Sequence, residues 1–203
     1  MGQYFKACNI DKKESVLPHT MGNMAKVMEH SYIGNNFVEL AMFQLANSWK
    51  GDRFAWAGDY ADENEEDDGN YYNAPEISID DLLVDKIKDN NQTALSLTGF
   101  LYNETTMEMV DLKKYNQIAP PTDEDFWLLH PLPLLTCTEQ GLGGGDYHGD
   151  LDDPRVGAWM GHALSVEADV LRSGYKDITD TLRFTTLSAD EIAELEDKRT
   201  PDV

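Results

Sequence analysis

The chain has 203 residues, of which 41% are hydrophobic, so it can bury a sizeable core as one domain or as two small lobes. Thirty-eight acidic residues against sixteen Lys and Arg give a formal net charge of −22, which disfavours direct binding to nucleic acid or to anionic membrane because both would be repelled. Cys8 and Cys137 are too few for a disulfide framework, and no signal-peptide-like stretch or long apolar run is present, so a cytoplasmic protein is expected.

The first part of the chain predicts a hairpin followed by a helix. Segments 3–9 and 14–17 flank the polar turn Ile10-Asp11-Lys12-Lys13, which is typical of two short antiparallel strands. Residues 36–46 then space their apolar side chains as an amphipathic helix does, with Asn36 as the expected cap and Glu39 completing a capping box.

A strand and a second helix are expected next. The run RFAWAGD at 53–59 favours a strand. Ser78 with Asp81 predicts the start of a helix, whose expected buried face is Ile79, Leu82, Leu83 and Ile87.

The second part of the chain begins with another predicted hairpin, over 95–112. Residues 113–125 are polar and contain two prolines, so a connecting loop is expected. The segment HPLPLLT is predicted to be extended because of Pro131 and Pro133, a strand is expected over 158–167, and a short helix from Ser188 to Lys198.

Two sequence elements recur in the same order. Trp49, Gly51 and Asp59 of WKGDRFAWAGD match positions 110 residues later in WMGHALSVEAD, and Asn9, Glu14 and Val16 match positions 94 residues later, in NETTMEMV. One insertion in the Gly/Asp-rich stretch near 140–155 reconciles the two offsets. The sequence therefore predicts an α+β fold of two related lobes, each with a hairpin, a Trp-containing strand and packed helices.

The expected boundaries follow from this repeat. Residues 1–92 would form the N-terminal lobe, 93–187 the C-terminal lobe with the Gly/Asp-rich insertion 139–155, and 188–203 a short helix and tail. The repeated tryptophans suggest packing more than ligand stacking. Within the repeat, Asp52 becomes His162 while its surroundings are kept, which makes this position a candidate for a single functional site.

The densest charge in the chain lies between 62 and 68. Six acidic residues occupy these seven positions: Asp62, Glu63, Glu65, Glu66, Asp67 and Asp68. Three interpretations stay open: a solvated loop, a face that binds a basic partner in the manner of nucleic acid, or a calcium site. The calcium alternative is the weakest because an EF-hand register places Pro75 where the bidentate Glu is needed.

The Gly/Asp-rich insertion is the second candidate site. Its glycines could expose backbone N–H groups to an anion, but the nearby carboxylates would repel a bare phosphate, so a divalent cation such as calcium, manganese or zinc is favoured over phosphate. The expected ligands are Asp146, His148, Asp150 and His162, and a plain surface loop is the alternative.

No complete catalytic motif is present. His19, His30 and His130 have no metal-ligand spacing, and the chain has neither a GxSxG elbow nor a P-loop. Catalytic residues are therefore not assigned.

Several blocks together resemble an uncharacterised family of bacterial and phage proteins beginning MGQYYK…NLDKKE. They are MGQYFKACNIDKKE, WAGDYAD, HPLPLLT, GGGDYHGD and VGAWMGH. The family has no established activity, so the resemblance transfers no site residue. This chain differs by its heavier acidic load and by Met160-Gly161-His162, where a WAxD-like run is expected.

Taken together, these features predict an acidic, non-catalytic binding protein. Its expected partner is a basic protein or a nucleic-acid-binding protein, engaged through the acidic run 62–68, as in a phage-type inhibitor of a host factor or a nucleic-acid mimic. No cofactor is expected on this interpretation. The alternative is a divalent-metal-dependent enzyme with its site on residues 141–153.

Overall fold

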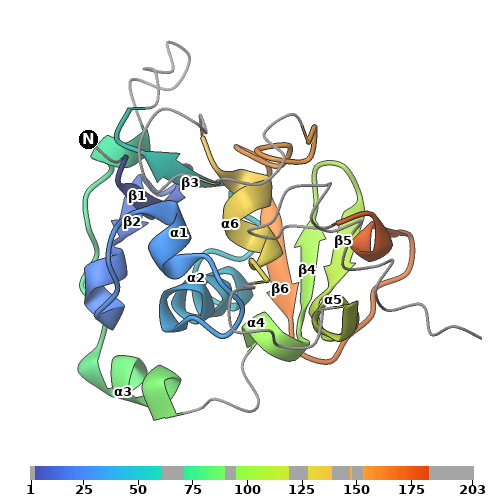
Figure 1. Ribbon diagram of the computed structural model, residues 1–203, viewed down its shortest axis with the longest axis horizontal. Coiled ribbons are helices and arrows are strands. Elements are labelled where there is room, and N and C mark those ends of the chain that lie inside the picture. Colours follow the sequence, from blue (N-terminus) through green and yellow to red (C-terminus); the bar gives the residue numbers. More distant parts are fainter. Residues whose placement is uncertain are drawn as a thin grey trace, which may run out of the picture.

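The computed structural model describes residues 3–60, 71–89, 95–118, 128–138, 147 and 153–182. It contains helices and two sheets, so the α+β class is confirmed. Figure 1 shows the first sheet on the left, the second on the right, and helices α2 and α6 in the middle. The predicted helix over 188–198 lies outside the described residues.

The first sheet is antiparallel and has the strand order β2-β1-β3. Its strands are β1 (Phe5–Asn9), β2 (Glu14–Val16) and β3 (Phe54–Gly58). Asn9 at the end of β1 faces Glu14 on one side and Phe54 on the other. The predicted hairpin and the predicted strand are therefore paired with each other.

The second sheet has the order β6-β4-β5-β7. Its strands are β4 (Phe100–Asn103), β5 (Glu108–Asp111), β6 (Leu164–Glu167) and β7 (Lys176–Asp177). Asn103 faces Glu108 and Leu164, which are the positions offset by 94 and 110 from Glu14 and Phe54. Only β7 is parallel to its neighbour.

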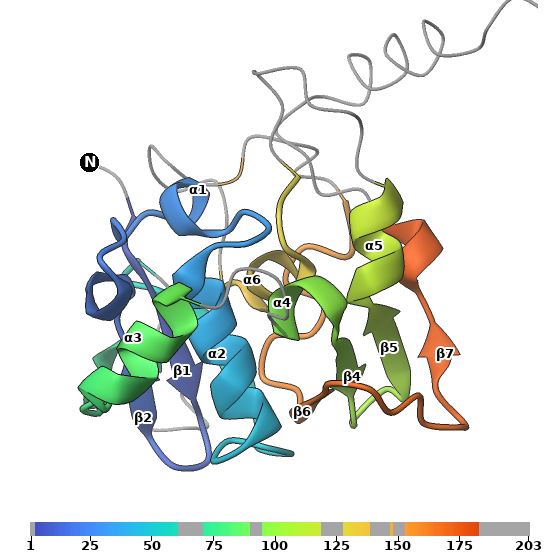
Figure 2. The same cartoon turned by 90° about the horizontal axis from the view of Figure 1, so that it is seen from below.

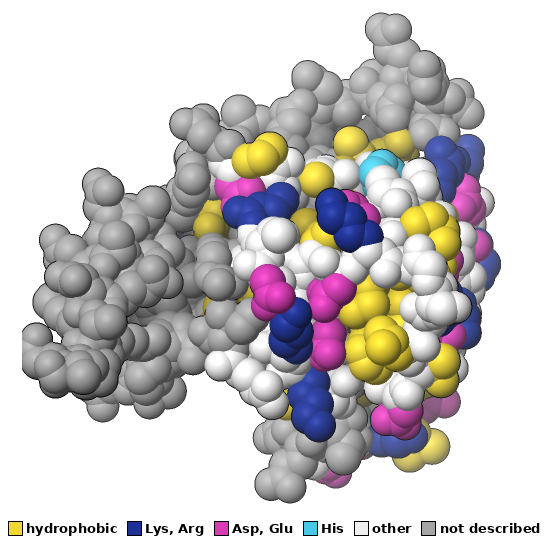
Figure 3. All heavy atoms as spheres, turned by 90° about the vertical axis from the view of Figure 1, so that its right-hand side faces the viewer, with side chains coloured by type: hydrophobic (Ala, Val, Ile, Leu, Met, Phe, Trp, Pro, Cys, Tyr) yellow, Lys and Arg dark blue, Asp and Glu magenta, His cyan; other side chains and the backbone are white. Residues whose placement is uncertain are grey.

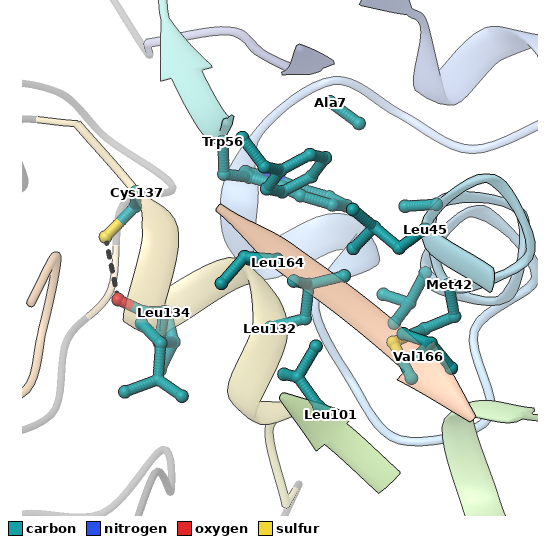
Figure 4. Packing of buried hydrophobic residues seen from close by; sticks show 14 of the residues in the cluster. Ala7, Met42, Leu45, Trp56, Leu101, Leu132, Leu134, Cys137, Leu164 and Val166 are labelled. Carbon is teal, nitrogen blue, oxygen red and sulfur yellow. Dashed lines mark hydrogen bonds between the residues drawn. The ribbon is translucent and has the colours of Figure 1, made fainter. Parts of the chain in front are cut away.

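The helices cross from one half of the chain to the sheet of the other. Helix α2 (Asn36–Ala46) packs on β6, and α6 (Pro131–Thr136) packs on β3. Figure 4 shows Met42 and Leu45 of α2 beside Val166 and Leu164 of β6, in a core where each is at most 1% exposed. Because each sheet buries its apolar face against the other half's helix, the halves share one hydrophobic core.

The remaining short elements lie around this core (Figure 2). They are η1 (Pro18–Met21), α1 (Val27–His30), η2 (Tyr71–Asn73), α3 (Asp81–Asp89), α4 (Leu95–Thr98), α5 (Leu112–Ile118) and η3 (Thr179–Thr181).

The two halves also meet along their backbones, at an antiparallel bridge between Arg53 and Ala163. Four hydrogen bonds surround it in two reciprocal pairs. Phe54 N donates to His162 O at 3.0 Å and Leu164 N donates to Asp52 O at 3.0 Å. The Gly51 and Gly161 amides, both in the left-handed region, donate to the carbonyls of Leu164 and Phe54. Positions 110 residues apart thus exchange equivalent bonds.

The extended structure predicted for HPLPLLT is wrong, because this segment forms α6. His130 is the N-cap, and its Nδ1 accepts a hydrogen bond from Leu132 N at 3.1 Å. Both Pro131 and Pro133 lie in the first turn, where backbone N–H groups have no partner within the helix. The missing proline donors therefore cost this helix nothing.

Two further segments are helical against expectation. Residues 95–98, predicted as strand, form α4 because the Glu39 carboxylate accepts the Leu95 and Ser96 amides at 2.9 and 2.8 Å. Part of the predicted loop 113–125 belongs to α5, which buries Tyr115 and directs its hydroxyl to Leu129 O at 2.9 Å. Residues 119–127 lie outside the described part.

Some predicted element ends are also corrected. Asn35, not Asn36, caps α2 by accepting from Phe37 N at 2.8 Å. Helix α3 begins at Asp81 and leaves Leu82 79% exposed, so Leu82 is not part of a buried face. Strand β6 begins at Leu164 rather than at 158, because the chain turns through Gly161 with φ +74°.

Candidate functional site

The C-terminal end of β3 is the point where both acidic segments leave the described fold. We call the region around Gly58 and Thr138 the β3 end. Gly58 N donates to Thr138 Oγ1 at 2.9 Å, and Thr138 N donates to Trp56 O at 3.0 Å. Gln3 covers Gly58 so closely that a Cβ there would lie 1.9 Å from its Nε2. Any larger residue here would require the Gln3 side chain to move.

The predicted partner-binding acids, Asp62, Glu63, Glu65, Glu66, Asp67 and Asp68, lie outside the described residues. The structure does describe their two flanks. The chain leaves β3 through Asp59 and Tyr60 and returns at Tyr71 in η2. From there it crosses the outer face of the first sheet to Glu76, which pairs in parallel with Ser15 at the far edge.

The second half has a corresponding crossing without an acidic run. There the chain passes from Ala168, the counterpart of Gly58, to Asp177, which pairs in parallel with Met109. Eighteen positions separate Gly58 from Glu76, whereas nine separate Ala168 from Asp177. The acidic run thus accounts for the extra length of the first crossing.

The predicted metal ligands Asp146, His148 and Asp150 also lie outside the described residues. The insertion leaves the described fold directly after Thr138, beside Gly58. His162 lies at the other end of β3, where its carbonyl accepts from Phe54 N. Four strand residues correspond to about 13 Å. The described part of the chain does not bring His162 to the start of the insertion.

A hydrogen bond also fixes the tautomer of His162. Asn103 Oδ1 accepts the Thr105 and Thr106 amides at 2.9 and 3.0 Å, so its amide nitrogen must face His162 Nδ1, at 2.9 Å. The neutral ring then carries its proton on Nε2. A metal on Nε2 would require the proton on Nδ1, against the Asn103 donor. This contact disfavours metal coordination by His162 and leaves Nε2–H as a donor.

Asp52 occupies the corresponding place in the first half. Asn9 Nδ2 donates to Asp52 Oδ2 at 2.8 Å, while Asn9 Oδ1 accepts the Lys12 amide at 2.9 Å. Lys12 Nζ lies 3.1 Å from the same carboxylate oxygen. The change from Asp52 to His162 therefore alters the side chain but keeps the asparagine contact, as expected for a structural position.

His30, His130 and the two cysteines are buried. Burial lowers the pKa of His30 to about 4, and its ring is fully used, with Trp56 Nε1 donating to Nε2 at 3.0 Å and Nδ1 at 3.0 Å from Met24 O. Burial lowers the pKa of His130 to about 3. Burial also raises the pKa of the Cys8 thiol to about 12. Both cysteines are free and buried, and Cys8 is not a reactive thiolate.

Among the residues that the structure describes, no group of three or more His, Cys, Asp or Glu side chains could hold a metal ion. No helix within those residues is long and apolar enough to cross a bilayer. The β3 end is a junction of chain segments.

Comparison with known proteins adds no assignment. No protein-family model matches the sequence, and neither a curated protein nor a solved structure is significantly similar to it. The family resemblance and the lobe boundaries 1–92 and 93–187 stay predictions. Sequence reasoning missed the pairing of Gly58 with Thr138, and the only available signal was the Gly of WAGD, because contacts 80 residues apart leave no local pattern.

Proposed function

We propose that the protein is an acidic binding protein that engages a basic macromolecular partner at the β3 end. The observation that carries this proposal is that two acidic segments leave the fold at one place. Segments 61–70 and 139–152 contain ten acidic residues and no Lys or Arg, and their described flanks, Gly58 and Thr138, are hydrogen bonded. Such a concentration of one sign attracts a basic surface by long-range electrostatics.

The positions of the cations also favour the β3 end as the binding surface, because the cations at the opposite end of β3 are paired with carboxylates. Lys12, Lys50 and Arg53 lie near the Phe54 end of β3, and each is paired, with Asp52, Glu167 and Asp11 respectively. On the face of the second half seen in Figure 3, Lys and Arg side chains lie beside Asp and Glu, without a large area of one sign. These pairs leave little net field there.

We also propose that the two halves are copies of one unit, and that the acidic segments are additions to this unit. The Trp49 and Trp159 indole nitrogens donate to Glu14 and Glu108 at 2.8 and 3.1 Å, and Lys13 and Met107 share a left-handed backbone. Each half has one acidic addition that its counterpart lacks. Tyr147 of the second addition is buried in the core, and we assign the acidic residues of the two additions to partner binding.

Basic surfaces of the required kind are typical of nucleic-acid-binding proteins, which present Lys and Arg to phosphates. A protein that occupied such a surface would act as an inhibitor by competing with the nucleic acid. This is the partner class that we propose, and the cytoplasm is the compartment in which we place the complex.

The test replaces the six acids at 62–68 by the corresponding amides. With tagged protein as bait in cell extract, we expect the wild type to retain a stoichiometric basic partner, to lose it as salt rises, and the variant to retain none. Thermal stability should stay nearly unchanged, because exposed charges contribute little to folding.

A matched control keeps the net charge comparable. Neutralising Glu65, Glu66 and Asp67 should weaken binding more than neutralising three exposed acids of α3: Asp81, Asp85 and Asp89. Equal effects would show that only net charge matters, and unchanged affinity of the six-acid variant would contradict the proposal.

A further inference from the structure

Two buried polar side chains lack hydrogen-bond partners where helix α4 meets the residue that caps α6. Ser96 and His130 are both 0% exposed, and neither the Ser96 hydroxyl nor His130 Nε2 has a partner in the described part of the chain. Buried polar atoms are normally paired, because an unpaired atom loses its hydration without replacement. We call Ser96 and His130 the α4 polar pair.

The two residues of the pair are neighbours in space. Burial lowers the pKa of His130 to about 3, and the Ser96 carbonyl lies close enough to the ring to oppose this shift in part. The backbone of His130 is also fixed, since its N donates to Ser31 O at 2.7 Å. Figure 2 shows α4 between α2 and α5, in the interior of the helical layer. The pair therefore lies inside the fold, where segments from both halves meet.

The cap of α6 determines which nitrogen of His130 carries the proton. Nδ1 accepts from Leu132 N at 3.1 Å, so it cannot itself be protonated. Because burial keeps the ring neutral, the single proton is on Nε2. His130 thus presents a buried N–H donor, and the group that pairs with it must be an acceptor.

The charge next to Ser96 limits what that group can be. The Glu39 carboxylate accepts the amides of Leu95 and Ser96 at 2.9 and 2.8 Å. Burial raises the pKa of the Glu39 carboxyl, while the amide of Ser96 and its hydroxyl both act to lower it. A carboxylate this close repels an anion, and a cation would face the proton on His130 Nε2. A small neutral group that both accepts and donates fits the pair best.

We propose that one water molecule is buried at the α4 polar pair, where it accepts from His130 Nε2–H and donates to the carbonyl or the hydroxyl of Ser96. Internal waters typically satisfy two to four buried polar groups in this way. This water joins α4 to the start of α6, while Glu39 joins α4 to α2. Together they fix α4 between helices of the two halves. The inference is independent of the proposed function.

A high-resolution crystal structure of the full chain is the first test. We expect an ordered water within about 3.2 Å of His130 Nε2 and within hydrogen-bond distance of Ser96. A direct hydrogen bond from His130 Nε2 to the Ser96 carbonyl, with no water between them, would overturn the proposal.

Nuclear magnetic resonance of the chain labelled with ¹⁵N-histidine tests the same site in solution. The Nε2 proton of His130 should show a cross peak to water, with opposite signs in the nuclear Overhauser and rotating-frame spectra, as expected for a bound water. His30 is the internal control. Its ring is also 0% exposed, but Trp56 Nε1 donates to its Nε2 and its Nδ1 faces Met24 O, so its proton should show no water cross peak.

The variant Ser96→Ala separates a bound water from an exchanging hydroxyl proton. The cross peak of His130 should persist in this variant, because the carbonyl at position 96 and His130 Nε2–H still hold the water. Loss of the cross peak in Ser96→Ala would assign it to the hydroxyl and overturn the proposal. An equal water cross peak from His30 would do the same, since it would show that water reaches fully paired buried rings as well.

Discussion

In each half a segment crosses the outer face of the sheet, and a cation stacked on a tyrosine ring joins the segment to the sheet. The two halves differ in whether the cation belongs to the sheet or to the crossing segment. In the first half the cation, Lys6, belongs to the sheet, while Tyr72 and Glu76 belong to the crossing segment. In the second half the cation is Arg172 of the crossing segment, and it lies 4.7 Å above Tyr102 of the sheet. Either arrangement anchors the crossing chain to the sheet.

The two crossings also differ in whether the carboxylates near them are paired with a cation. Arg172 binds Glu104 and Glu167, both at 2.6 Å, so the shorter crossing neutralises the carboxylates beneath it. Burial raises the pKa of Glu104, but hydrogen bonds from Ser165, Tyr175 and Arg172 outweigh this and hold it below the ordinary value. The first crossing instead contains six additional acids, at 62–68. The shorter crossing therefore pairs its nearby carboxylates with Arg172, whereas the longer crossing has six acidic residues and no Lys or Arg between 61 and 70.

The largest effect is expected at the two tryptophans that begin the corresponding turns. Trp49 is fully buried and Trp159 is 2% exposed, so replacement of either by Ala should cost about 3–5 kcal/mol of unfolding free energy. Trp49→Phe and Trp159→Phe keep most of the packing but leave Glu14 or Glu108 without its indole donor, and each should cost about 1–3 kcal/mol.

Urea unfolding of the four variants measures these losses. If the halves are equivalent, Trp49→Phe and Trp159→Phe will give similar losses. A loss in one half that is several times the loss in the other would break the comparison.

The next effect concerns pH and His30. Its pKa is lowered from the ordinary 6.5 to about 4 by burial, so the unfolded chain takes up a proton before the folded protein does. The stability from neutral His30 is fully present above pH 6.5 and is lost as pH falls towards 4, by on the order of 3 kcal/mol. His30 belongs to the first half and binds Trp56. The residue corresponding to Trp56 in the second half is Val166, so we expect no similar pH-dependent contribution to stability from that position.

This prediction is checked by comparing the urea unfolding of the wild type with that of His30→Gln at pH 7 and pH 4.5. The difference between the two proteins should shrink at the lower pH, since only the wild type loses the histidine contribution. Carboxylate titration affects both proteins alike and cancels. A constant difference across this range would contradict the assignment of His30 as a buried neutral ring.

A smaller effect is expected at Arg172. Replacement by Met leaves Glu104 and Glu167 without their guanidinium partner and should cost about 1–3 kcal/mol. Lys114→Met, which removes exposed contacts to Asp177 and Asp180, should leave stability almost unchanged. Chemical unfolding of both variants at low and high salt measures the two losses of stability. Equally small losses in the two variants would show that the Arg172 contacts do not anchor the crossing segment.

Much of the fold could be predicted from the sequence, because it depends on local patterns of turn residues and of apolar spacing. The polar turn Ile10-Asp11-Lys12-Lys13 predicted the first hairpin, and the spacing of apolar residues at 36–46 predicted α2, although its cap is Asn35 and not Asn36. The repeated Asn, Glu and Trp positions also identified which residues make corresponding contacts, since Asn9 and Asn103 both end a strand and bind across the turn.

Tertiary structure decided the elements whose local signals are overridden by distant groups. Residues 95–98 are helical because Glu39, more than fifty residues away, accepts their first amides, and HPLPLLT is helical because both prolines fall in the first turn. Composition alone determined that the chain is strongly acidic. Only the contact between Gly58 and Thr138 showed that two acidic segments leave the fold side by side, because a contact across 80 residues follows from packing and not from any local pattern.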